Sequence, residues 1–80
     1  MEELRNIGPV SAGRLAAVGI DTRGDLERVG ALAAYLLVKE RFPEQTSLNL
    51  LYSLEGALLD VPWHQLPEAL MERLRVAAMA

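Results

Sequence analysis

The sequence predicts an all-α protein, a compact single domain of five to six short helices over residues 1–80. No stretch alternates apolar and polar positions with the period of two that a half-buried strand shows. Apolar residues make up 51% of the chain and aromatic residues only 5%, so the core consists mainly of Leu, Ala and Val, which favours helices over sheets. A chain of this length is close to the lower limit at which one core suffices.

The composition excludes several classes of protein. The absence of cysteine excludes a disulfide-stapled scaffold and a Cys-based zinc finger. The longest apolar run, Ala31 to Val38, is far shorter than the roughly 20 residues that span a bilayer. The first residues, Met1-Glu2-Glu3, do not resemble a signal peptide. We therefore expect a soluble cytoplasmic protein without a membrane partner.

The net charge of −3 limits how nucleic acid could be bound. Binding driven by backbone charge usually needs a basic surface, and this chain has no Lys/Arg-rich run. Any contact with nucleic acid must therefore be local.

Local signals set the bounds of the first helices. A short helix is predicted to end near Asn6, and a second to begin at Pro9 or Val10, because proline is tolerated at the first helical position. Gly19 suits the left-handed position after this helix and Ile20 the apolar position that follows, which together predict a Schellman stop. The residues of the second helix predicted to face inward are Ala12, Leu15 and Ala16.

The third helix is predicted to start at a capping box. Thr22 can accept a hydrogen bond from the Asp25 amide, and Asp25 can return one. Gly30 ends this helix after Val29. The residues of this third helix that are predicted to face inward are Leu26 and Val29.

The predicted fourth helix, about Ala31 to Arg41, is apolar on nearly all sides through Val38. Such a helix is surrounded by others or lies in an oligomer contact. Phe42-Pro43 ends it, because the residue before proline is pushed out of the helical region.

The second half of the chain is predicted to hold two more helices and a tight turn. One helix follows an N-cap at Thr46 or Ser47 and runs to about Leu59. Residues 63–65 form a single turn, the last helix runs from Pro67 towards Val76, and residues 77–80 fray. The predicted inward residues are Leu51, Leu54 and Leu58 in the first of these helices, and Leu70, Leu74 and Ala77 in the last.

The best candidate for a binding site is the turn before the second helix. Free amides at a helix start bind anions, and a glycine lets a phosphate approach closely. Gly8, Val10 and Ser11 could supply N–H groups here, with Arg5 and Arg14 nearby as side-chain donors. The alternative is that Gly8 only makes a tight connection between helices.

Four other residues have mainly structural interpretations. Gly13 lies in mid-helix, where close packing of the fourth helix is the expected reason for a glycine. Glu55 projects near the apolar arc and needs a partner or an exit to solvent. Trp63 is expected to fill the bottom of the core. His64 lacks a second His or Cys with which to bind a metal, so we predict no metal site, no cofactor and no catalytic residue.

A series of these residues is found together in a known family. The sequence resembles the C-terminal domain of the TfoX/Sxy competence-regulator family from about Leu4 to Leu74, and the segment Asn49 to Leu58 is the most specific part. The residues that carry the resemblance are Ile7-Gly8-Pro9, Gly19-Ile20, Thr22, Asp25-Leu26, Gly30-Ala31, Tyr35, Leu48 to Tyr52, Leu54 to Leu58, Trp63 and Leu66-Pro67.

The resemblance implies an all-helical domain whose first half is similar to helix-hairpin-helix modules and to the C-terminal domain of the RNA polymerase α subunit. Those relatives bind DNA through hairpin amides and nearby basic residues, and the family's role is regulation of competence genes. Members typically carry a separate N-terminal domain, and we expect this chain to be the C-terminal unit alone. Two positions differ from the usual hairpin: Asn6 replaces a glycine, and Pro9 removes a donor. The residues implied to contact DNA are Arg5, Gly8, Ser11 and Arg14.

The leading hypothesis is a non-enzymatic module for transcription regulation that contacts DNA, or a DNA-bound transcription complex, through residues 6–14. The alternative is a protein–protein interaction module or small homodimer that uses the apolar helix 31–41 or the Leu-rich face of the helix that follows. An enzyme would need a pocket that joins Glu55 and His64 with Tyr52 or Tyr35.

Overall fold

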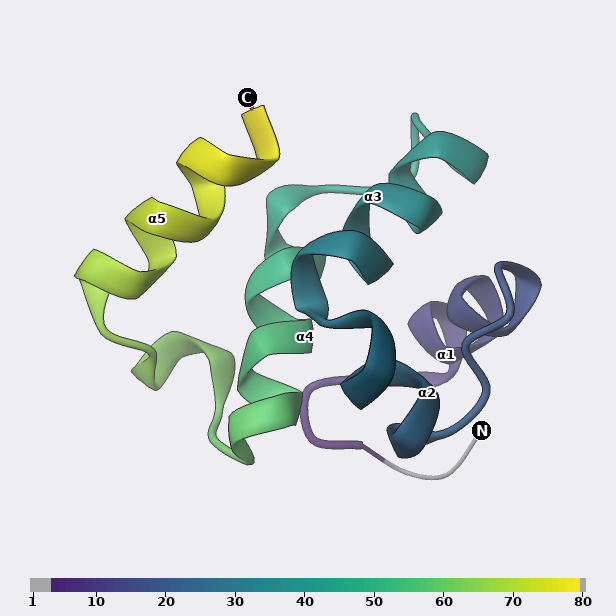
Figure 1. Ribbon diagram of the computed structural model, residues 1–80, viewed down its shortest axis with the longest axis horizontal. Coiled ribbons are helices and arrows are strands. Elements are labelled where there is room, and N and C mark those ends of the chain that lie inside the picture. The colour runs from purple at the N-terminus through teal and green to yellow at the C-terminus, as the bar shows by residue number, and fades with distance from the viewer. Residues whose placement is uncertain (1–3, 80) are drawn as a thin grey trace.

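The computed structural model describes residues 4–79, and these fold into α-helices with one short 3₁₀ helix, η1 (Figure 1). No helix in this described part is long and apolar enough to cross a membrane. The elements are α1 (Pro9–Ala17), α2 (Arg23–Val29), α3 (Ala31–Arg41), α4 (Leu48–Leu59), η1 (Trp63–Gln65) and α5 (Glu68–Met79). The prediction of an all-α fold is therefore confirmed.

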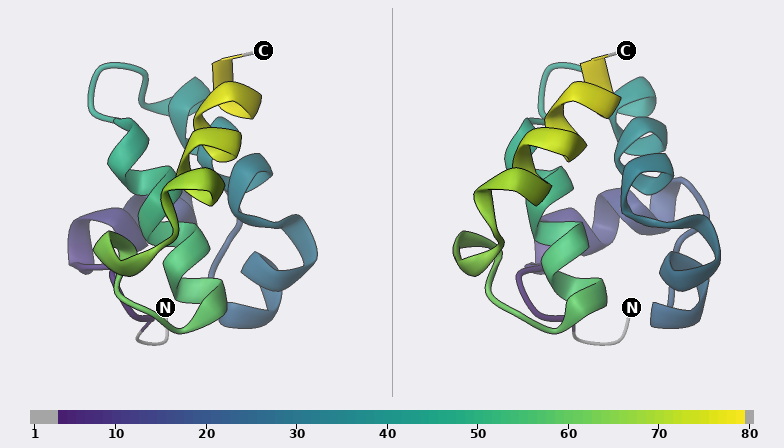
Figure 2. Two further views of the ribbon diagram at one scale, coloured as in Figure 1. Left: turned by 90° about the vertical axis from the view of Figure 1, so that its left-hand side faces the viewer. Right: turned by 60° about the vertical axis from the view of Figure 1, so that its left-hand side comes forward.

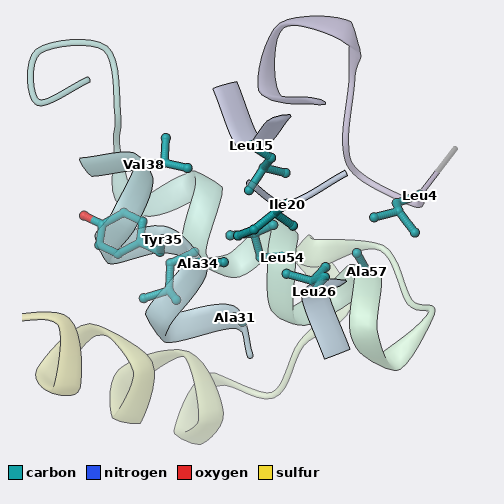
Figure 3. Close-up of a cluster of buried hydrophobic side chains, with 11 residues drawn as sticks. Leu4, Leu15, Ile20, Leu26, Ala31, Ala34, Tyr35, Val38, Leu54 and Ala57 are labelled. Carbon is teal, nitrogen blue, oxygen red and sulfur yellow. The ribbon is translucent and has the colours of Figure 1, made fainter. Parts of the chain in front are cut away.

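Helix α4 lies at the centre of the molecule and packs against α3 (Figures 1 and 2). Helices α1 and α2 lie on one side of this pair, and α5 lies across the other side, where it contacts both α3 and α4. Figure 3 shows how side chains from distant segments meet between the helices. The largest fully buried side chains are Leu15, Ile20, Leu26, Val38, Leu51 and Leu54.

The predicted helix stops and starts are confirmed around α2. The amide of Gly19 donates to the carbonyl of Ala16 at 3.0 Å and the amide of Ile20 to that of Leu15 at 2.9 Å, which is the Schellman pattern, and Gly19 has φ 86°. At the start of α2, Thr22 and Asp25 exchange both bonds of a capping box. At α4 the N-cap is Ser47, which makes no side-chain cap bond, while the Thr46 hydroxyl donates to the carbonyl of Phe42 at 2.7 Å.

The predicted first helix is wrong in its described part. Residues 4–7 form a tight turn in which the amide of Ile7 donates to the carbonyl of Leu4 at 3.1 Å. Asn6 has φ 72°, a left-handed conformation that ends any helical path. Residues 1–3, which the prediction also covered, lie outside the described residues.

Three predicted inward positions are also wrong. Ala16 and Ala77 are exposed, and Val29, the last residue of α2, is 36% exposed. Helix α5 continues to Met79 instead of fraying after Val76, and it packs Leu74 and Ala78 against the core. The inward-facing residue that follows Leu74 in α5 is therefore Ala78, four positions on, whereas the prediction placed Ala77 there, three positions on.

Two single residues differ from their predicted roles. A Cβ atom added to Gly13 would meet no atom within 4 Å, so no helix packs closely across it. Trp63 lies in η1 and is only half-buried, so it does not fill the bottom of the core.

Candidate nucleic-acid interface

The N-terminus of α1 is an uncapped helix end. Its N-cap, Gly8, has extended backbone angles (φ −85°, ψ 179°), no side chain caps the helix, and its first turn holds no acidic residue. Within the described part of the chain, the amides of Val10 and Ser11 donate no hydrogen bond. These N–H groups and the helix dipole favour an anion at this end.

A polar pocket of about 150 Å³ lies beside this end and joins α1 to the start of α4. Ser11 and Arg14 both contribute to its wall, and no carboxylate does. Arg14 therefore gives the wall one uncompensated positive charge. The lining residues are Asn6, Ser11, Arg14, Gln45, Thr46, Ser47, Asn49, Leu50 and Ser53.

Arg14 is held in place by neutral groups. Its Nη1 donates to the carbonyl of Gln45 at 2.9 Å, and its guanidinium lies 5.8 Å from the centre of the Phe42 ring. Both partners belong to the loop between α3 and α4. Because neither partner carries a charge, Arg14 keeps its charge available for an anion.

Arg5 is directed elsewhere. Its Nε donates to Asp60 Oδ1 at 3.1 Å, and both side chains are largely exposed. The structure thus brings Ser11 and Arg14 together in the pocket, leaves Gly8 exposed at the adjacent helix start, and pairs Arg5 with a carboxylate at the end of α4.

Asn6 has a role that the sequence analysis missed. Its Nδ2 donates to the carbonyls of Val61 at 2.9 Å and Ser53 at 3.4 Å, and its Oδ1 accepts from the Trp63 amide at 3.2 Å. The side chain therefore ties the turn before α1 to α4 and to η1. Asparagine is one of the few residues that tolerate a left-handed φ, which explains how it occupies this turn. This tolerance of asparagine for a left-handed φ was the one signal in the sequence that could have indicated a turn at Asn6.

Two other basic residues donate hydrogen bonds to backbone carbonyls. Arg23 donates from Nη1 and Nη2 to the carbonyls of Ala57 and Leu58, each at 2.9 Å, at the C-terminal end of α4. Lys39 Nζ donates to the carbonyls of Pro43 and Thr46, also at 2.9 Å. Both side chains have structural roles, because Arg23 joins α2 to the C-terminal end of α4 and Lys39 joins α3 to the loop that follows it.

The residues considered for an enzyme are spread over three elements. Tyr35 is buried on α3, Tyr52 and Glu55 are half-buried on α4, and His64 is exposed on η1. The His64 ring lies edge-on to Trp63, with ring centres 5.9 Å apart. Glu55 forms no ion pair with a described residue, and because its side chain is only half-buried, its charge can reach solvent.

Comparison with protein families identifies the domain. The model of the TfoX C-terminal domain matches residues 1–78. The chain belongs to this family. The match covers nearly the whole sequence. The resemblance to this family that the sequence motifs predicted is therefore confirmed.

Two crystal structures of proteins from Listeria monocytogenes are similar to this TfoX C-terminal domain. An uncharacterized protein in a triclinic form is 38% identical with a TM-score of 0.86, covering 91% of this chain and 82% of its own. A protein of unknown function in a tetragonal form is 33% identical with a TM-score of 0.85, covering 98% of this chain and 99% of its own. No curated protein matches the chain.

Proposed function

We propose that this TfoX C-terminal domain is a non-enzymatic cytoplasmic module that contacts duplex DNA, or a DNA-bound transcription complex, through the edge formed by residues 6–14. The observation that supports this most strongly is the polar pocket beside the α1 N-terminus, which Ser11 and Arg14 line without any carboxylate. Free amides, a hydroxyl and a guanidinium are the groups with which proteins bind backbone phosphates.

The charge of the molecule sets how such binding behaves. With a net charge of −3, the domain is repelled by DNA at long range, so few phosphates are contacted and binding is weak on its own. A DNA-bound protein partner would supply the remaining affinity. A role in regulating competence genes follows from the family resemblance.

Titration of a fluorescently labelled DNA duplex at low and moderate salt tests this proposal. We expect weak binding at low salt that decreases as salt rises, and loss of binding in Arg14→Glu and in the double variant Arg5→Glu with Arg14→Glu. Arg73→Glu on α5 is the matched control, because it makes the same charge change at an exposed residue far from α1 in the chain.

Each failure has its own meaning. Absence of binding by the unchanged protein at low salt contradicts the proposed function. Binding that persists in the double variant contradicts the site. Since Arg14→Glu also removes the bond to Gln45, Arg14→Gln and a melting curve for each variant separate lost contacts from lost folding.

A second candidate function is protein–protein interaction without nucleic acid. Leu36 and Leu37 on α3 are 43% and 41% exposed, and they offer an apolar contact to a partner or a second copy. The Leu-rich face of α4, the other surface considered for this role, places Leu51 and Leu54 in the core.

A further inference from the structure

The basic side chains of this acidic protein fall into two groups. Four of the eight form an ion pair with a described carboxylate: Arg5, Arg23, Arg28 and Arg75. The other four, Arg14, Lys39, Arg41 and Arg73, form none with any carboxylate of the described residues. Three of these four meet at the loop between α3 and α4, and the fourth lies on α5.

Phe42 is the centre of this group. The Arg41 guanidinium lies 4.8 Å from the centre of its ring and that of Arg14 5.8 Å, although Arg41 ends α3 and Arg14 lies on α1. Lys39 binds the carbonyls of the same loop. In the left view of Figure 2 the loop and α1 lie on the same side of the molecule.

We propose that Arg41 is a second phosphate contact, so that the interface for duplex DNA runs from the α1 pocket across Phe42 to the C-terminal end of α3. This inference rests on the proposed function. A guanidinium supported by an aromatic ring is restrained before binding and loses less conformational freedom when a phosphate arrives. Arg41 is exposed and forms no ion pair with a carboxylate of residues 4–79 that a phosphate would have to displace.

Two acidic residues moderate this surface. Glu40 and Glu44 are exposed neighbours of Arg41 in the chain, and they lower the local positive potential. They explain how the contact coexists with weak overall binding. The same reasoning predicts that Glu44→Gln tightens binding.

The test compares Arg41→Gln with Arg73→Gln in the duplex titration at several salt concentrations. Both variants remove one exposed arginine that has no carboxylate partner among the described residues, one beside Phe42 and one on α5. For Arg41→Gln we expect affinity to fall about fivefold and the dependence of log affinity on log salt to become shallower by about 0.9. Arg73→Gln should leave both quantities as they are.

The salt dependence separates a phosphate contact from a structural role, because loss of a helix-end charge lowers the melting temperature without changing that slope. Equal effects of the two variants, or an unchanged slope in Arg41→Gln, would overturn the inference while the proposed function stands. The inference would also be overturned if an acidic peptide bound more tightly than the duplex and displaced it, because this surface would then be a binding site for a protein partner. Failure of the unchanged protein to bind DNA would remove the proposed function itself.

Discussion

Gly56 makes room for the turn that positions α1. A Cβ atom at this residue would lie 2.5 Å from Asn6 Nδ2 and 2.7 Å from the carbonyl oxygen of Val61. Real Cβ atoms do not approach other atoms so closely, and the Asn6 side chain is fixed by its bonds to Val61 and Trp63. The glycine in the middle of α4 is therefore required by packing and not by helix formation.

A pair of glycine-to-alanine variants tests this assignment. Gly56→Ala should destabilise the domain by about 2 kcal/mol, because the added methyl group must displace the Asn6 turn. Gly13→Ala is the matched control: it also lies within a helix, but its Cβ would meet open space, so it should stabilise the domain by about 0.5–1 kcal/mol. Denaturant unfolding measures both. Equal effects of the two substitutions would show that the close approach at Gly56 is relieved at little cost.

At the scale of a helix end, the α2 capping box carries a charge that titrates. The amide of Asp21 donates to Asp25 Oδ2 at 3.0 Å, and this bond, together with the ion pair to Arg28 and the Thr22 amide, lowers the pKa of Asp25 below its ordinary value of 3.8. A carboxyl group whose pKa is lowered by folding stabilises the folded state above the pKa of the unfolded chain. That stability is lost as the pH falls towards the lower, folded pKa.

We therefore expect acid to weaken the unchanged protein more than Asp25→Asn. Between pH 6 and pH 3 the melting temperature of the unchanged protein should fall further than that of Asp25→Asn. Only the unchanged protein has a carboxyl group at residue 25 that takes up a proton on unfolding. The difference between the two curves therefore measures the contribution of the carboxyl group at residue 25. Asp21→Asn removes a neighbouring charge and is the control: its melting temperature should depend on pH as that of the unchanged protein does. Parallel curves of melting temperature against pH for all three proteins would mean that Asp25 does not contribute.

Helix ends whose signals lie within a few residues were predictable from the sequence. Gly19 with Ile20, and Thr22 with Asp25, satisfy the free backbone groups of their own helices, so their meaning does not depend on the rest of the fold. Asn6 could not be interpreted in this way. Its partners lie 47 to 57 residues away, and the same turn could have been helical without them.

The same limit applies to the candidate interface. Spacing placed Arg5 and Arg14 near one turn, but the carboxylate that pairs with Arg5 comes from the far end of α4. From the sequence alone, Arg41 was identified only as the last residue of the fourth helix. Arg41 and Arg14 both lie near the Phe42 ring because the loop brings this ring against α1.

For the molecule as a whole, exposed apolar side chains are distributed over all five helices named above. The large ones that are most exposed are Val10, Leu59, Val76 and Met79, on α1, α4 and α5, and none of them is adjacent in the chain to Leu36 and Leu37. Scattered apolar residues are normal on a monomer, whereas an interface needs a contiguous area. The apolar face of α3 is mostly used inside the fold, through Ala31, Ala34, Tyr35 and Val38.

We therefore expect a monomer, and light scattering over a wide range of concentrations should return the mass of one chain. The double variant Leu36→Gln with Leu37→Gln should leave both this mass and DNA affinity unchanged, since neither substitution changes a charge and neither residue lines the α1 pocket. A mass that rises with concentration and returns to one chain in the double variant would favour the protein-interaction function. The two candidate functions thus predict opposite results for one pair of leucines, because a phosphate contact depends on charge and an association through α3 depends on apolar area.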